Sequence, residues 1–421
     1  MLPARRGERY SGAMTDKDRL LDLHEMIIAK ALAGAEEHVL LNSVCDQLTA
    51  LGMSLRRVVL GMEELHPTVE GHVVEWRRDD GNAAMRPYDR TVWAEKQEDW
   101  LRSPFYRLLA ENRTRMRRRI GDNYRQGEFE MIDQLFAEGA RDYVAYCIPY
   151  NDAARATESD RLYSSWTSER PDGFTDSHMV MLDHLVPTLG LALRSRAVAR
   201  SASNVLQTYL GRDAGTRVLR GQIERGITQR IDAVLWYSDL VGFTRIADTV
   251  PSDQVVPLLN DYAECQVGAI HDHGGEVLKF VGDGLLAIYP IDQGQDPSAA
   301  CKRALRAAKE AYRRLAALNH RRAAEGLATT KFYMALHIGE VLYGNIGSQE
   351  RLDFTVVGPA VNEVSRIEAL SRSIDREIIM SGAFAREAAE AGARLASLGR
   401  FALRGVARPQ ELFTLDTDAP P

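Results

Sequence analysis

The chain has 421 residues, of which 45% are apolar and 27% charged, a composition typical of a soluble globular protein. This length exceeds one ordinary hydrophobic core and predicts at least two domains. With 53 basic and 59 acidic residues the net charge is −6, which disfavours nucleic acid or an anionic membrane as a partner.

Features that the sequence lacks predict the cellular compartment of the protein. No apolar run reaches the length of a membrane span, and residues 1–18 lack the apolar segment of a signal peptide. The four cysteines have no metal-ligand spacing, so we expect buried, reduced thiols rather than a disulfide frame or a zinc site. Together these features predict a cytoplasmic protein, or one that is tethered only by a partner.

The first part of the chain mixes helical and strand patterns and predicts an α+β domain over residues 19–196. A helix beginning at Thr175 carries a long apolar stripe at helical spacing, with Thr175 as its N-cap. In chain order we expect helices over 20–51 and then a hairpin of strands 57–62 and 72–76 that turns at His66-Pro67. Helical structure should follow up to residue 136. The last elements before the helix from 175 should be strands at 143–148 and 162–167.

This element order resembles a GAF-like sensory module. The resemblance implies a pocket for a small-molecule ligand that regulates the rest of the chain, and a dimerisation scaffold without a ligand is the alternative. The basic run at 113–119 has no interleaved aromatic residues, so we interpret it as a solvated helix face rather than a nucleic-acid site.

Residues 197–230 are polar, punctuated by glycines and mostly helical in pattern, and we interpret them as a helical connector. Their apolar positions form a short, interrupted seam that could pair two parallel helices. The positions are Val205, Leu206, Tyr209, Leu210, Val218, Leu219 and Ile223.

Two glycine-flanked aspartates mark the second domain. Asp239 follows a short apolar strand and precedes a turn at Gly242, where a helix begins. A strand end with a carboxylate and a helix N-terminus suits a divalent cation and a phosphate. The second aspartate, Asp283, lies in a Gly-Asp-Gly hairpin turn 44 residues later.

The elements around these aspartates follow the order β-α-β-β-α-β of a ferredoxin-like palm. We expect strands at 233–237, 276–281, 285–289 and 331–337, with helices at 252–273 and 298–325. In such a sheet the first strand lies beside the hairpin, which would bring Asp239 and Asp283 together. The alternative is that each aspartate only caps its own turn.

Over residues 231–415 the sequence resembles the class III nucleotidyl cyclases. Four motifs in a fixed order carry the resemblance. They are SDLVGFT at 238–244, KFVGDG at 279–284, HIGEV with GNIG at 337–347, and DFTVVGPAVNEVSR at 353–366.

The resemblance implies a role for each matching residue. Asp239, Asp283 and the Leu240 carbonyl would hold two Mg²⁺ or Mn²⁺ ions. Phe243 and Thr244 would donate backbone N–H groups to the ATP phosphates.

Further matches concern the base and the reacting phosphate. Lys279 and Thr355 would read adenine, whereas guanylate cyclases usually have Glu at the lysine position. Asn362 and Arg366, four residues apart on a helix, would orient the ribose and stabilise the α-phosphate. Arg404 would contact the terminal phosphates.

In this family the metal-binding and base-reading residues come from opposite protomers, which implies a homodimer. The expected reaction is conversion of ATP to cyclic AMP and pyrophosphate. The alternatives are a guanylate or relaxed-specificity cyclase, and a catalytically dead nucleotide-binding regulator. His337 is expected to pack rather than to take part in the chemistry.

Overall fold

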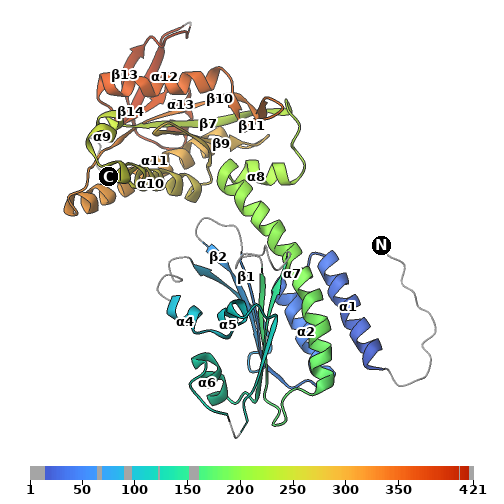
Figure 1. The fold of residues 1–421 in the computed structure, drawn as a ribbon. Helices are drawn as coiled ribbons and strands as arrows, with labels where there is room; N and C mark the ends of the chain where they lie inside the picture. The colour runs from blue at the N-terminus through green and yellow to red at the C-terminus, as the bar shows by residue number, and fades with distance from the viewer. Residues whose placement is uncertain are drawn as a thin grey trace. The chain divides into compact units, whose positions relative to one another are not determined.

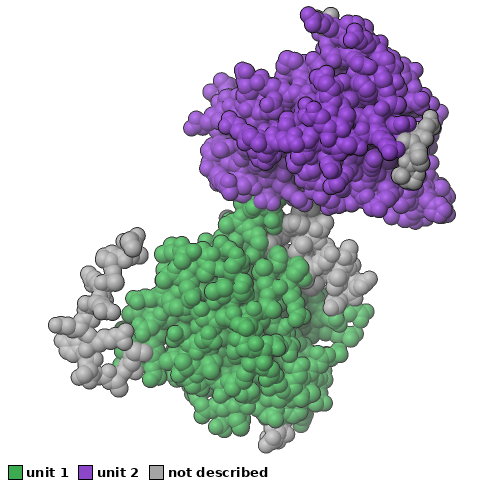
Figure 2. All heavy atoms as spheres, turned by 180° about the vertical axis from the view of Figure 1, so that it is seen from behind, with its two compact units in different colours: residues 1–205 green, residues 206–421 purple. Residues whose placement is uncertain are grey.

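A computed structural model describes residues 15–63, 69–89, 97–121, 124–150, 161–406 and 408–416. The chain forms two compact units, residues 1–205 and 206–421, coloured separately in Figure 2. Each unit has its own sheet, so the fold is mixed α+β, as predicted. None of the helices in the described ranges combines the length and apolar character that a membrane crossing needs.

The first unit is built on a six-stranded antiparallel sheet in the order β3-β2-β1-β6-β5-β4 (Figure 1). Its strands are β1 (Leu55–Glu63), β2 (Val69–Arg77), β3 (Ala83–Asp89), β4 (Arg115–Arg119), β5 (Asp142–Pro149) and β6 (Arg161–Ser168). Helices α1 (Asp16–Leu32), α2 (Glu37–Ala50) and α7 (Asp176–Leu210) pack on one face through one hydrophobic core. Helices α4 (Gln97–Leu101), α5 (Pro104–Ala110) and α6 (Glu130–Ala137) belong to the opposite side, where a second core lies.

Several predicted features of this unit are confirmed. Strands β1 and β2 pair antiparallel, with Gly61 opposite Val73, although the expected turn at His66-Pro67 lies outside the described residues. Thr175 caps helix α7, because its Oγ1 accepts a hydrogen bond from the His178 N–H at 3.2 Å. Helix α7 continues to Leu210, through the first part of the segment expected to be the connector.

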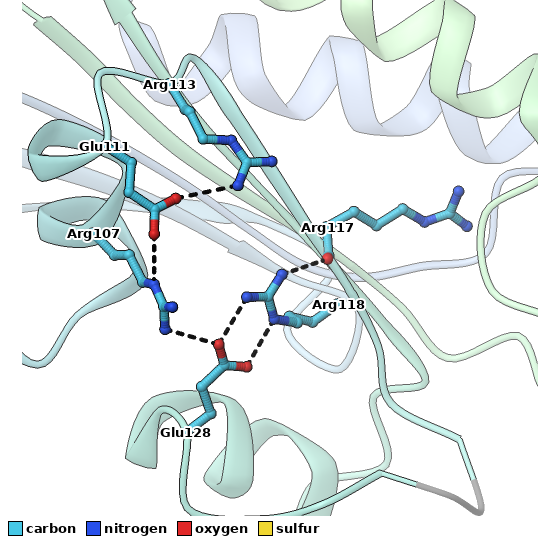
Figure 3. A network of polar contacts seen from close by, with 6 residues as sticks. All are labelled: Arg107, Glu111, Arg113, Arg117, Arg118 and Glu128. Carbon is cyan, nitrogen blue, oxygen red and sulfur yellow. Dashed lines mark hydrogen bonds and ion pairs between the residues drawn. The ribbon is translucent and has the colours of Figure 1, made fainter.

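The expectation of helical structure up to residue 136 was wrong in part, because β3 and β4 lie there. The basic run is therefore on an edge strand, not a helix face, and neighbouring carboxylates neutralise much of it. Arg118 donates two hydrogen bonds to the carboxylate of Glu128, at 2.8 and 2.7 Å, while Arg113 pairs with Glu111 (Figure 3).

Arg115, Arg117 and Arg119 lie on one face of β4, and Arg118 lies on the other. In Figure 3 the Arg117 side chain points away from Glu128, and its guanidinium instead pairs with the buried Asp142. Arg115 pairs with Asp183 of α7. Ion pairs of this kind reduce the unbalanced positive charge of the basic run.

The second unit has an eight-stranded sheet in which β13-β14-β12-β10-β7-β9-β8 follow one another and β11 pairs with β10. The strands are β7 (Thr228–Leu240), β8 (Glu276–Val281), β9 (Gly284–Ile291), β10 (Phe332–Gly347), β11 (Leu352–Val357), β12 (Ile378–Ser381), β13 (Leu395–Phe401) and β14 (Gln410–Leu415). The helices are α8 (Arg212–Leu219), α9 (Phe243–Thr249), α10 (Ser252–Asp272), α11 (Pro297–Ala324), α12 (Pro359–Ile374) and α13 (Gly382–Glu390).

The predicted β-α-β-β-α-β order is confirmed by β7, α10, β8, β9, α11 and β10. Helices α10, α11 and α13 share one core on one face of the sheet, and α12 and α8 share a second core on the other. Helix α10 ends as expected just before Gly274, whose φ of 74° is the left-handed conformation that glycine favours. Strands β7 and β10 are much longer than predicted, and β7 pairs with β10 along its whole length, from Leu240–Phe332 to Thr228–Gly344.

Candidate active site

The end of strand β7 is held rigidly, which fixes the position of Asp239. The Ser238 hydroxyl accepts a hydrogen bond from the Trp236 indole at 3.2 Å and donates one to Gln266 Oε1 at 2.5 Å. One residue past the strand, the Val241 N–H donates to the Lys331 carbonyl at 2.7 Å. Because these partners are buried or in the adjoining segment, the backbone at Asp239 has little freedom.

The structure brings Asp239 and Asp283 together. Ser238 of β7 is opposite Leu285 of β9, so the hairpin turn that carries Asp283 lies beside the end of β7. Gly284 makes this approach possible, since a Cβ there would lie only 2.5 Å from the Ser238 carbonyl oxygen and 3.1 Å from Asp239 Oδ1. Any larger residue would push the two carboxylates apart.

Two further charged residues complete this cluster, and the sequence interpretation missed both. Arg372 of α12 forms an ion pair with Asp239, with 3.5 Å between Nη2 and Oδ2. Burial, and then the charge of Asp283, raises the pKa of Asp239 to about 6. Burial and the charge of Asp239 raise the pKa of the Glu368 carboxyl, also on α12, to about 7.

This accumulation of negative charge fits a divalent cation. Asp239 and Asp283 repel one another, and oxygen ligands suit Mg²⁺ or Mn²⁺. Among the described residues, no three or more His, Cys, Asp or Glu side chains are arranged to hold a metal. A site here would therefore depend on the two aspartates, backbone oxygens such as that of Leu240, and the substrate itself.

In the metal-free protein, the repulsion among the carboxylates near Asp239 should lower the stability of the fold as the pH rises. Because the pKa values of Asp239 and Glu368 are raised on folding, the folded state binds more protons, and stability falls as the pH rises from about 4 to about 7. We expect Asp283→Asn to relieve part of this loss and to stabilise the metal-free protein at pH 8 by roughly 1–2 kcal/mol after solvent screening. The measurement is thermal unfolding in EDTA.

A matched variant separates this effect from a general change in charge. Asp248→Asn removes an exposed carboxylate on α9 and should leave the unfolding temperature nearly unchanged. At pH 5 the gain in unfolding temperature of Asp283→Asn over the wild type should be smaller than at pH 8. An equal advantage at pH 5 and pH 8 would contradict the assigned repulsion.

Lys279 and Thr355, the predicted base-reading pair, lie on strands that the fold brings into contact. Strand β11 folds against β8, and Leu278 and Phe354, each next to one member of the pair, belong to the same core. Thr355 is 4% exposed, and its Oγ1 has no hydrogen-bond partner among the residues that the structure describes. A buried hydroxyl left unpaired is costly, so it is well placed to pair with a ligand.

Arg366 and the turn that carries Arg404 are also brought together. A Cβ on Gly405 would lie 3.5 Å from Arg366 Nη1, so the turn rests against this guanidinium. Arg404 itself is exposed, and Asn362 is exposed in the first turn of α12. The result is a group of positive charge and amide donors that could hold phosphate oxygens.

Within one chain, however, this group does not meet the aspartate pair. Helix α12 presents Arg372 to Asp239, and Asn362 lies ten residues earlier, about 15 Å along the helix axis. Phe243 and Thr244 begin helix α9 after Gly242, on the same side of the domain as Asp239. The predicted site residues thus form two sets, one around Asp239 and one around Asn362 and Arg366.

His337 packs, as predicted. It is 7% exposed, its Nδ1 lies 2.8 Å from the Ser381 hydroxyl, and burial lowers its pKa to about 4. The ring is therefore neutral at physiological pH and serves the core between β10 and β12.

Comparison with known proteins identifies the class of this domain. Residues 228–417 match the adenylate and guanylate cyclase catalytic domain, so the second unit carries a nucleotidyl cyclase domain. The match spans the candidate site in full, and the family model covers cyclases of both bases.

Particular relatives are similar over the same part of the chain. Adenylate cyclase 1 of Rhizobium meliloti (strain 1021) is 30% identical over 156 residues, which is 37% of this chain and 23% of that protein. The adenylate cyclase of Anabaena cylindrica is 30% identical over 168 residues, 39% of this chain and 32% of that protein. The crystal structure of the guanylyl cyclase Cya2 is 29% identical, with a TM-score of 0.39, and covers 44% of this chain and 92% of that one. The chain thus matches about a quarter to a third of the length of these curated relatives.

Proposed function

We propose that this protein is an adenylate cyclase that converts ATP into 3′,5′-cyclic AMP and pyrophosphate in the cytoplasm. The observation that carries the proposal is the meeting of Asp239 and Asp283 at the end of β7, inside a cyclase domain. The reaction is an attack of the ribose 3′-hydroxyl on the α-phosphate, with pyrophosphate as the leaving group.

Two Mg²⁺ or Mn²⁺ ions would be held by Asp239, Asp283 and the Leu240 carbonyl. When bound, such ions make the 3′-hydroxyl easier to deprotonate and neutralise the triphosphate. The chain supplies the remaining contacts with the phosphates. The N–H groups of Phe243 and Thr244 are in the first turn of α9, where a helix has no internal acceptors for them, and they would donate to phosphate oxygens.

The choice of adenine rests on hydrogen-bond polarity. Lys279 would donate to adenine N1, and the Thr355 hydroxyl would accept from the exocyclic amine. Guanine presents a donor and a carbonyl at these positions, so the same pair would leave groups unmatched. The unpaired Thr355 hydroxyl supports this assignment, because it has a hydrogen bond to gain from the base.

Lys279→Glu should weaken the use of ATP, since the carboxylate cannot donate to N1. We expect kcat/KM for ATP to fall on the order of 10²-fold or more. The measurement is cyclic AMP and cyclic GMP formation, each with its own nucleotide. Lys302→Glu, an exposed lysine on α11, is the matched control and should keep wild-type kinetics. A Lys279→Glu enzyme as active on ATP as the wild type would remove Lys279 from the base site.

The two separate sets of residues support a homodimer with shared sites. Asn362 and Arg366 would orient the ribose and stabilise the charge that develops on the α-phosphate, acting on ATP held by the partner's aspartates. Strand β8 is a sheet edge, and its last two residues, Phe280 and Val281, are 59% and 42% exposed, which leaves an apolar surface for a second chain to cover. A two-fold pair would form two equivalent sites.

Two alternatives have distinguishable outcomes. A guanylate or relaxed-specificity cyclase would use GTP at a comparable rate, and Lys279 disfavours it. A catalytically dead regulator would bind nucleotide without turnover, and the presence of Asp239, Asp283, Asn362 and Arg366 disfavours that. Cyclic nucleotide formation by the full chain and by residues 231–421, with ATP and GTP assayed separately, decides among the three.

For the N-terminal part we propose a regulatory role. The antiparallel sheet with helices on both faces supports a GAF-like sensory domain over residues 19–196 that binds a small molecule. Residues 197–230 would connect it to the catalytic domain at 231–415. The assay of the two chain lengths also tests this role, since removal of the first unit should change turnover.

A further inference from the structure

Arg372 is a positively charged residue beside the proposed metal site. It belongs to the last turn of helix α12, and its Nη2 lies 3.5 Å from Oδ2 of Asp239. A cation near the C-terminus of a helix favours the helix itself, so this position alone would not indicate a role. The contact with Asp239 does indicate one, because the guanidinium and a metal ion would need the same carboxylate.

The fold directs Asp239 toward α12 rather than toward the helices on the other face of the sheet. Side chains alternate along strand β7, and Ser238 points to the α10 side, where it bonds to Gln266. Asp239 therefore points to the face that α12 covers. Tyr237, two residues earlier on that face, packs in the core that contains Ile367 of α12. The pairing of Asp239 with α12 thus follows from the alternation of side chains along β7.

Helix α12 brings two opposite charges to this place. Glu368 and Arg372 are four residues apart, so they lie on the same side of the helix, one turn from each other. Glu368 is 7% exposed, whereas the side chain of Arg372 is 60% exposed. An exposed guanidinium can leave its partner for water at little cost. Arg372 is therefore a displaceable partner of Asp239.

The charges around Asp239 do not balance without a further cation. The carboxyl groups of Asp239, Asp283 and Glu368 share the one guanidinium of Arg372. A divalent ion would supply the missing positive charge, but it would then lie close to Arg372. Because like charges at short range repel, Arg372 and the ion compete for Asp239.

We propose that Arg372 is a positioning residue that holds Asp239 in the metal-free enzyme and yields it to the incoming ion. The ion pair must stretch or break before the ion binds, so Arg372 raises the metal concentration at which the site fills. The inference rests on the proposed function, because it takes Asp239 as a metal ligand.

Manganese binding without nucleotide tests this competition in the absence of turnover. Free Mn²⁺ is measured by electron paramagnetic resonance during titration of the full-length protein, and binding that Asp239→Ala abolishes is assigned to the site. Arg372→Gln should bind Mn²⁺ about three- to tenfold more tightly than the wild type, because one exposed ion pair and one nearby like charge are lost. Arg376→Gln is the matched control. It removes the same charge from an exposed residue just beyond α12 and should keep the wild-type affinity.

Arg372→Lys separates the charge of the side chain from a purely structural role. Lysine keeps the positive charge and a good helical propensity, so it should restore most of the wild-type Mn²⁺ affinity. Two results would overturn the proposal. One is a wild-type affinity in Arg372→Gln, and the other is weaker binding in that variant, which would mean that Arg372 assists the metal.

A double-mutant cycle in EDTA tests the ion pair itself. At pH 8, Arg372→Gln should lower the unfolding temperature of the metal-free protein, because Asp239 loses its partner. In an Asp239→Asn background the same change should have a smaller effect. Equal effects in the two backgrounds would mean that the pair does not hold the carboxylate, and they would count against the proposal.

Failure of the proposed function would look different. Tighter Mn²⁺ binding by Arg372→Gln, with no cyclic AMP formed by the wild type, would support the role of Arg372 and count against the cyclase activity. Turnover of ATP by the wild type, with unchanged Mn²⁺ affinity in Arg372→Gln, would support the cyclase and count against the competition. A lack of Mn²⁺ binding that depends on Asp239 would count against both.

Discussion

Asp239→Ala and Asp283→Ala are each expected to abolish cyclic nucleotide formation, with turnover reduced on the order of 10³-fold or more. The two carboxylates lie at the end of β7 and in the β8–β9 turn, and both proposed ions need them as ligands. With the ions lost, their charge would no longer neutralise the triphosphate or favour the deprotonated 3′-hydroxyl. Asp239→Asn should behave similarly, because a neutral amide is a poor ligand for Mg²⁺.

Structural controls decide whether such losses are local. Both alanine variants should keep the wild-type circular dichroism spectrum and sedimentation, since removal of one carboxylate relieves repulsion and creates no core cavity. Asp248→Ala, exposed on α9, should remain fully active. Near-normal turnover of either site variant with Mg²⁺ would contradict the metal assignment.

The sequence predicted the catalytic unit well where local signals were strong. Gly274 ended α10, and the turn at Gly282 and Asp283 joined β8 to β9, because glycines with positive φ leave few alternatives. The extents of β7 and β10 were not predictable in the same way. Residues 228–232 are mostly exposed and polar, and they are strand only because they pair with 340–344, more than 100 residues away.

The site was predicted unevenly for a similar reason. Asp239 and Asp283 each carry a turn signature, so their types and places could be inferred from local sequence. Glu368 and Arg372 have only an i, i+4 spacing on α12, a pattern found on many solvated helices. Their part in the cluster depends on how α12 packs across β7, which is a tertiary fact.

For the basic run at 113–119 of the first unit, the predicted secondary structure was wrong. Five arginines within seven residues favoured a solvated helix face on propensity and charge alone. The strand β4 forms because Met116 is buried and its backbone pairs with β5, while partners distant in sequence, such as Asp142 and Asp183, neutralise the arginines. Those partners cannot be read from a local window.

The proposed shared site predicts a second large effect, which is the recovery of activity when two inactive variants are mixed. Asp239→Ala lacks the metal set but keeps Asn362 and Arg366, and Asn362→Ala has the opposite defect. Each homodimer should be nearly inactive, since both of its sites contain the same lesion. In a mixed dimer one site collects both lesions and the other collects neither.

Mixing the two proteins under conditions that allow subunit exchange should therefore restore activity. With random exchange half of the dimers are mixed, and each has one intact site of two, so recovery should approach about a quarter of the wild-type rate. Mixing Asp239→Ala with Asp283→Ala is the matched control. Both lesions lie in the same set, so every site in that mixture contains a damaged aspartate pair and should stay inactive. No recovery in the first mixture, with exchange shown independently by pull-down of differently tagged chains, would mean that each chain builds its site alone. The distance along α12 between Asn362 and Arg372 would then have to be bridged within one domain.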